Sequence, residues 1–96
     1  MPLPSDLDRL VADDLYAKLI ARHGTFWSVV YPLFMAREIT RATVRNVVQR
    51  GLEDAGGNYQ QVVRRFNMPP QDCKRFLNFL TKYELALLVR PYERSS

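Results

Sequence analysis

The sequence predicts a single all-α domain of about five helices, and three observations support this prediction. Apolar residues recur at intervals of three and four along most of the chain, which is the spacing of a helix face. Residues that favour helix N-caps stand before four of these runs: Ser5, Thr25, Thr40 and Asn58. The chain has 96 residues, 47% of them hydrophobic and 25% charged, so its size and composition are those of one globular domain.

The first helix is expected to begin at Ser5 and to end at His23 and Gly24. Asp6 and Asp8 fall in its first turn, where the helix dipole favours negative charge. The apolar stripe consists of Leu7, Leu10, Val11, Leu15, Leu19 and Ile20. The pattern is long enough for about four to five turns.

A second, shorter and strongly aromatic helix is expected after Thr25. Its apolar residues are Phe26, Trp27, Val30, Tyr31, Phe34 and Met35. Pro32 removes a backbone donor and disfavours helical geometry at the residue before it, so the sequence predicts a kink, or a break with a new turn starting there. We interpret the aromatic residues as core rather than as a cofactor site.

The third helix is expected to begin after Thr40 and to end at Gly56 and Gly57. One face carries Val44, Val47, Val48, Leu52 and Ala55, and the opposite, solvated face carries Arg45, Asn46, Gln49, Arg50 and Glu53. Gly51 lies on the apolar face, where a helical glycine indicates a close crossing with another element.

The next segment has the pattern of a helix-turn-helix. Asn58 and Gln61 have the spacing of a capping box, and Asn67 to Pro69 predict a tight turn, because Asn tolerates left-handed backbone and Pro cannot continue a helix. The first helix carries Val62, Val63 and Phe66. Pro70 is expected to start the second helix, with Cys73, Phe76, Leu77 and Leu80 on its apolar face. We expect Phe79 and Tyr83 to pack under residues 5–37.

The charges indicate an anionic partner. The chain has 14 Lys and Arg against 10 Asp and Glu, a net charge of +4. Residues 1–40 contribute −1 and residues 41–96 contribute +5. Such asymmetry is typical of proteins that bind nucleic acid or a membrane surface, although many basic surfaces are merely solvated.

Other classes of protein are disfavoured. A single Cys73 and a single His23 provide no internal disulfide and no familiar zinc site, and no nucleophile–base pair can be assembled, so we expect no cofactor, no metal and no enzymatic activity. The N-terminus lacks the features of a secretory signal, and no apolar run is long enough to cross a bilayer. We therefore expect a cytoplasmic protein that does not bind membranes.

Double-stranded DNA is the partner that the second helix of the motif favours. Its outer face carries donors that read base edges in the major groove, chiefly Lys74, Arg75 and Asn78. The candidate contacts of this helix are Gln71, Asp72, Lys74, Arg75, Asn78 and Lys82. The candidate phosphate contacts are Asn58, Tyr59, Arg64 and Arg65.

The run Gly51-Leu52-Glu53-Asp54-Ala55-Gly56-Gly57-Asn58, followed by a two-valine helix, a turn and a basic helix, resembles the Fis-type helix-turn-helix. This is the DNA-binding module that ends many NtrC-like bacterial activators. The likeness covers residues 41–83, and residues 5–40 look like the segment that precedes the module in a subset of those activators. It implies a DNA-binding regulator and places Lys74 and Arg75 where the family has its basic contacts.

The sequence departs from the family pattern at the start of the second helix. Pro69 and Pro70 replace polar residues that contact DNA in Fis-type modules, and Asp72 replaces a Thr or Ser-like residue. Asp72 would repel phosphate, but it would also favour the start of a helix or accept a hydrogen bond from a cytosine amino group. Asn67 and Met68 are physically reasonable substitutions in the turn.

These observations divide the chain into an N-terminal helical extension (1–40) that packs on the module, the helix-turn-helix (41–83) and a C-terminal tail (84–96). We expect a homodimer whose seam is formed by Val44, Val47, Val48, Gly51 and Leu52, with regulatory or ATPase domains possible upstream in the same protein. The alternative is a helical dimerisation or protein-interaction module that has kept the scaffold and lost its DNA contacts. Pro69, Pro70 and Asp72 favour that alternative.

Overall fold

The computed structural model describes residues 4–85, with side chains described from residue 7 onward, and it is all-α over that range. Its helices are α1 (Pro4–Ile20), α2 (Phe26–Val29), α3 (Tyr31–Met35), α4 (Arg41–Asp54), α5 (Tyr59–Arg65), the short 3₁₀ helix η1 (Pro70–Asp72) and α6 (Cys73–Lys82). The expected break at Pro32 is confirmed, because Val30 ends α2 and begins α3. Of the expected tail, only Glu84 and Leu85 lie among the described residues.

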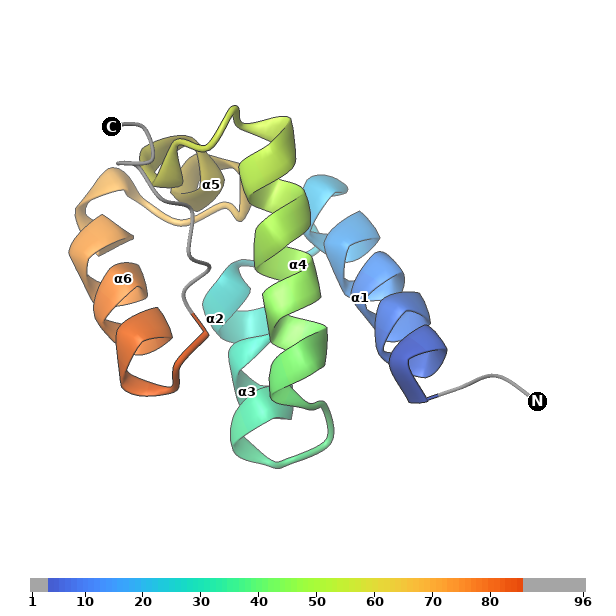
Figure 1. Cartoon of the computed structure of the whole chain (residues 1–96). Coiled ribbons are helices and arrows are strands. Elements are labelled where there is room, and N and C mark those ends of the chain that lie inside the picture. The colour runs from blue at the N-terminus through green and yellow to red at the C-terminus, as the bar shows by residue number, and fades with distance from the viewer. Residues whose placement is uncertain (1–3, 86–96) are drawn as a thin grey trace, which may run out of the picture.

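Helix α4 runs through the middle of the molecule, with α1 on one side and α6 on the other (Figure 1). The α1–α4 contact is closed by polar groups at both ends. The Asp8 carboxylate accepts hydrogen bonds from the hydroxyls of Thr40 and Thr43, each at 3.0 Å, and the Tyr16 hydroxyl donates to Asp54. Because early residues of α1 meet early residues of α4, and late residues meet late ones, the two helices run parallel.

Helix α1 ends earlier than His23 and Gly24, the expected stop. Arg22 adopts a left-handed conformation with φ of 62°, and the His23 N–H donates to the Lys18 carbonyl at 3.0 Å. These are the features of a Schellman end, in which the left-handed residue is usually glycine. Gly24 instead permits a close approach, since a Cβ there would lie 2.5 Å from the Ser28 hydroxyl oxygen.

The expected caps of α4 and α5 are present, with one difference. The Thr40 side chain accepts from the Thr43 N–H at 3.1 Å, and the Asn58 side chain accepts from the Gln60 and Gln61 N–H groups at 2.8 and 3.3 Å. The capping box at Asn58 is only half formed, because its own N–H donates to the Ala55 carbonyl. Left-handed backbone at Gly56 and Gly57, with φ of 68° and 85°, turns the chain so that the Asn58 N–H reaches that carbonyl.

The core is centred on Phe26. Its ring lies 5.0 Å from that of Phe76, 5.7 Å from that of Phe79 and 5.9 Å from that of Phe66, measured between centroids, and Phe26 is fully buried. The aromatic segment is therefore core, as the sequence indicated. Residues from both halves of the chain share this single core.

The residues expected to form a dimer seam are also core residues. Val44, Val47, Val48, Gly51 and Leu52 are all buried within one chain. The seam prediction is thus corrected at these positions, because α1, α5 and the aromatic core cover the apolar face of α4 and leave it no exposed surface. The close approach predicted at Gly51 is confirmed: Phe66 packs against this glycine, and a Cβ there would lie 2.8 Å from Cζ of Phe66.

The buried face of α6 is rotated from the one expected. Phe76, Phe79 and Leu80 are buried, and Phe79 packs against Tyr31 and Phe34, as predicted for a contact with residues 5–37. Leu77, expected on the apolar face, is 36% exposed. Phe79 packs against aromatic rings of α2 and α3. Because Phe79 faces the core, Leu77 lies on the outer side of α6.

Candidate nucleic-acid interface

Helix α6 presents a polar outer face over its whole length. Gln71 in η1 and Lys74, Arg75, Asn78 and Lys82 in α6 are all exposed. Apart from the adjacent pair Lys74 and Arg75, neighbouring members of this set are three or four residues apart, which places them along one side of the segment. The helix continues four residues past Asn78. The exposed side chains expected to read DNA therefore share one face, with Leu77 and Thr81 exposed beside them.

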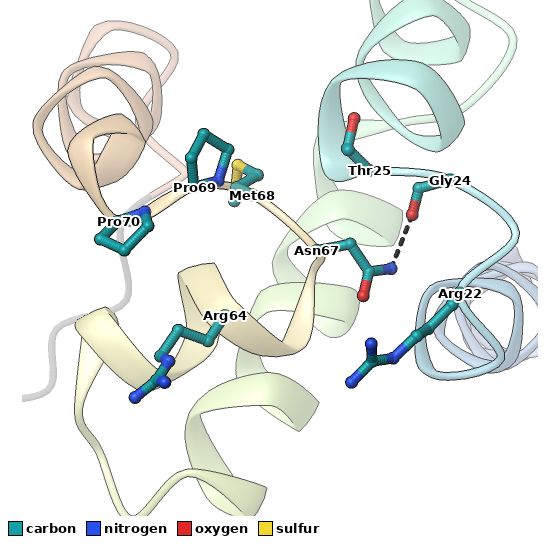
Figure 2. Close-up of a pocket in the computed structure, with 8 residues that line it drawn as sticks. All are labelled: Arg22, Gly24, Thr25, Arg64, Asn67, Met68, Pro69 and Pro70. Atoms are coloured by element: carbon teal, nitrogen blue, oxygen red, sulfur yellow. Dashed lines mark hydrogen bonds between the residues drawn. The ribbon is translucent and has the colours of Figure 1, made fainter.

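The side chain of Asn67 holds the turn before α6 in place, in addition to the backbone role that the sequence predicts for this residue. Asn67 has the predicted left-handed backbone, with φ of 63°. Its side-chain amide also donates to the Leu19 carbonyl at 2.8 Å and to the Gly24 carbonyl at 2.7 Å, the second of which Figure 2 shows. The turn is thereby attached to the segment between α1 and α2. No pattern in the sequence links these residues, which are more than forty positions apart.

Pro70 begins a short 3₁₀ turn, and the α-helix starts only at Cys73. Because neither Pro69 nor Pro70 has a backbone N–H, the beginning of this segment offers little to a phosphate. Contacts with an anion at this end of the segment can therefore begin only at Gln71.

Trp27 of α2 forms a platform beneath two of the candidate contacts. The Arg75 guanidinium carbon lies 4.2 Å from the centroid of the indole ring, a cation–π arrangement, and the indole N–H donates to the Asp72 carboxylate at 3.1 Å. Asp72 is therefore directed at Trp27 and makes no side-chain cap at the start of α6. The stacking restricts the guanidinium of Arg75 to one location on the surface.

The candidate phosphate contacts have different surroundings. Arg64 is exposed on α5, whereas Arg65 donates to the Asp54 carbonyl at 2.9 Å and so helps to close the end of α4. The side-chain oxygen of Asn58 is used by the α5 cap. Tyr59 is half-buried, with its ring 6.4 Å from that of Phe76. Arg64 and Arg65 are both exposed cations, but among residues 4–85 the Arg64 side chain makes no hydrogen bond or ion pair, so of the four it is the one available to a phosphate.

Comparisons of the chain with protein-family models, curated protein sequences and solved structures gave no match. Among residues 4–85, no helix has both the length and the apolar character that a membrane span requires. The same residues contain no group of three or more His, Cys, Asp or Glu side chains placed to hold a metal ion.

Proposed function

We propose that this domain is the sequence-specific DNA-binding domain of a bacterial transcriptional regulator, with α6 as its recognition helix. The observation that carries the proposal is the row of exposed donors on α6, held on a helix whose other side is anchored in an aromatic core. The resemblance of residues 41–83 to the Fis-type module supports the same function.

The chemistry of the row suits a major groove, which is about 12 Å wide and admits one α-helix. Lys74 and Arg75 are donors for the acceptor edge of guanine, and Asn78 pairs well with adenine. The exposed Leu77 adds an apolar group of the kind that contacts a thymine methyl. A guanidinium held on Trp27 loses less conformational freedom on binding than a free one.

The negative charge of Asp72 is less unfavourable than the sequence suggested. Its carboxylate accepts the Trp27 indole hydrogen bond and lies beside Arg75, which is stacked on the same ring. A nearby cation reduces the repulsion that this carboxylate would exert on a phosphate. In this proposal, the Asp72 carboxylate orients the Trp27 ring on which Arg75 stacks.

The proposed active form is a homodimer, since one short helix buries too little surface for tight and selective binding. The face of α4 first assigned to the seam is buried. The outer face of α1 groups several exposed apolar side chains, with Leu7, Leu10 and Val11 exposed by 51%, 60% and 40%. We assign the dimer contact to this face.

The experiment is a selection of bound duplexes from a randomised DNA pool, followed by affinity measurements on the selected site. We expect Arg75→Ala to weaken binding by about tenfold or more, because a bidentate base contact contributes about 1–3 kcal/mol of discrimination. Arg45→Ala is the matched control, since Arg45 is an exposed arginine on α4 whose guanidinium donates to the Glu84 carbonyl.

Salt dependence gives a second criterion. With three phosphate contacts per chain in a dimer, the logarithm of the affinity should fall with the logarithm of salt concentration at a slope of about −5. A failure of the wild-type protein to enrich any sequence, or to bind duplex DNA at low salt, would reject DNA binding.

The second candidate function is a dimerisation or protein-interaction module without DNA contacts. The exposed apolar side chains of α1 are the observation that favours it. Under this alternative, Leu10→Ser would lower the mass in solution or the binding of a protein partner, while Arg75→Ala would change neither. DNA enrichment by the wild-type protein separates the two candidates.

A further inference from the structure

A groove of about 690 Å³ lies beside the turn that leads into α6. Its walls come from two distant parts of the chain: Arg22 and Thr25 from the segment between α1 and α2, and Arg64, Asn67, Pro69 and Pro70 from α5 and the turn. Figure 2 shows Arg64 and Arg22 on either side of Asn67. The side chain of Asn67 joins the two walls through its hydrogen bonds to Leu19 and Gly24.

The groove is cationic. Two of its lining residues are arginines, and none is Asp or Glu. Arg22 and Arg64 are both exposed, and neither makes an ion pair or a side-chain hydrogen bond with any residue from 4 to 85. In contrast, several other cations are engaged: Lys18 pairs with Asp14, Arg50 pairs with Asp13, and Arg65 donates to a carbonyl.

The groove adjoins the face of α6 described above. A second hollow, lined by Gln60, Gln61, Arg64 and Pro70, shares two residues with it. Gln71, the first exposed residue of the α6 face, follows Pro70 directly. The groove with Arg22 and Arg64 therefore adjoins the start of the exposed face that continues along α6, so a single DNA backbone could run from the groove to Gln71.

We propose that Arg22 and Arg64, on the two walls of this groove, each bind a phosphate of the same stretch of DNA backbone. This inference rests on the proposed function and extends it, because Arg22 belongs to the N-terminal extension, to which no contact with DNA was assigned. The extension would then both complete the core and provide a charge-assisted hydrogen bond to the partner. Charge-assisted contacts from two arginines would also place α6 in register with the groove of the duplex.

The backbone conformation of Arg22 permits a test in which loss of folding is not expected. Arg22 is left-handed, so glycine at this position removes the cation and relieves an unfavourable conformation. Arg37 is an ideal control because it is exposed, has φ of 61° and closes α3 in the same way, with the Glu38 N–H donating to the Leu33 carbonyl. It lines a different hollow, together with Phe34, Ile39 and Tyr83.

The experiment measures the affinity of wild-type, Arg22→Gly and Arg37→Gly proteins for a fluorescent mixed-sequence duplex of about 30 base pairs, at several salt concentrations. We expect Arg22→Gly to weaken binding about tenfold at low salt and to reduce the salt slope by about 0.9 per chain. Its thermal midpoint should stay unchanged or rise. Arg37→Gly should retain the wild-type slope.

Arg64→Gln and the double variant complete the test. If each arginine binds its own phosphate, the two single losses of affinity should multiply in the double variant, and its salt slope should fall by about 1.8 per chain. Wild-type binding with an unchanged slope in Arg22→Gly would overturn this inference and leave the proposed function standing. Equal losses in Arg22→Gly and Arg37→Gly would also overturn it, since they would reflect net charge alone. If the wild-type protein binds no duplex, both proposals fail.

Discussion

Helices α4 and α6 both carry a basic outward face, and the two faces are used differently. On α4, Arg45 donates to the Glu84 carbonyl at 2.6 Å, and Arg50 forms an ion pair with Asp13 and lies over the Tyr16 ring. On α6, Lys74 and Asn78 are exposed and make no hydrogen bond or ion pair within the described residues. Arg45 and Arg50 thus attach other segments to α4. On α6, Lys74 is available to a partner, whereas Arg75 is exposed but stacks on Trp27 and Lys82 lies over the Tyr83 ring.

This difference teaches that a basic helix face is informative about binding only when the hydrogen-bond donors of its side chains are not used inside the fold. Both faces have the same amphipathic pattern in the sequence. The distinction arises because Asp13 of α1 and Glu84, which follows α6, bring acceptors to Arg50 and Arg45, whereas Lys74 and Asn78 have no such neighbour among residues 4–85. Three predictions examine this contrast, in order of decreasing effect.

The largest effect should separate the inner from the outer face of α6. Phe79 is 7% exposed, so Phe79→Ala should destabilise the domain by about 3–5 kcal/mol through a cavity among the aromatic rings. Leu77→Ala should change stability by less than about 1 kcal/mol, because Leu77 is partly exposed. Urea unfolding measures both variants. The reverse order of effects would restore the face expected from sequence spacing and contradict the observed orientation of α6.

An intermediate effect should separate the two basic faces. Lys74→Gln and Arg50→Gln each remove one positive charge from an exposed position. We expect Lys74→Gln to reduce the salt slope of DNA binding by about 0.9 per chain and to leave stability within about 0.5 kcal/mol of wild type. Arg50→Gln should retain the slope and cost about 0.2–1 kcal/mol of stability through its lost ion pair.

The control in this comparison is internal, because both variants have the same net charge. Salt titrations of DNA binding and urea unfolding on the same preparations provide the two measurements. A similar reduction of the slope in both variants would show that the distinction between paired and unpaired faces has no consequence for binding.

The smallest effect concerns the polar contact between α1 and α4 at high pH. Burial and the hydrogen bond to Asp54 raise the pKa of Tyr16 from its ordinary value of 10.0 to about 12. Because the folded pKa is above the unfolded one, the neutral hydroxyl stabilises the fold fully below pH 10, and this stabilisation is lost as the pH rises towards 12. The stability of Tyr16→Phe should therefore fall less between pH 10 and 12 than that of wild type. Parallel slopes in urea unfolding would show that the contact does not depend on the Tyr16 proton.

Local sequence signals predicted most of the helices, because caps and breakers act within a few residues. Thr25, Thr40 and Asn58 begin helices as expected, and Pro32 separates α2 from α3. The end of α1 was misplaced because Arg22, rather than a glycine, adopts the left-handed conformation. Nothing in local composition distinguishes such an arginine from one in a helix.

The candidate site was only partly predictable. The exposed donors of α6 follow from helical spacing. The contact between Trp27 and Arg75 and the groove shared by Arg22 and Arg64 were not predicted, since these pairs are 48 and 42 positions apart, respectively. The buried face of α4 was assigned to a dimer for the same reason. An apolar stripe indicates that a surface will be buried, but it does not indicate whether the same chain or another chain buries it.

By itself, the sequence determined the all-helical class, the location of the turn at Asn67 and the basic character of the segment that follows, because each depends on residues close together in the chain. Only the tertiary structure decided which way α6 faces, which arginines are paired and which segment lines the groove with Arg64. Those properties depend on how the aromatic side chains of α2, α3 and α6 pack together, and packing joins residues that no local pattern connects.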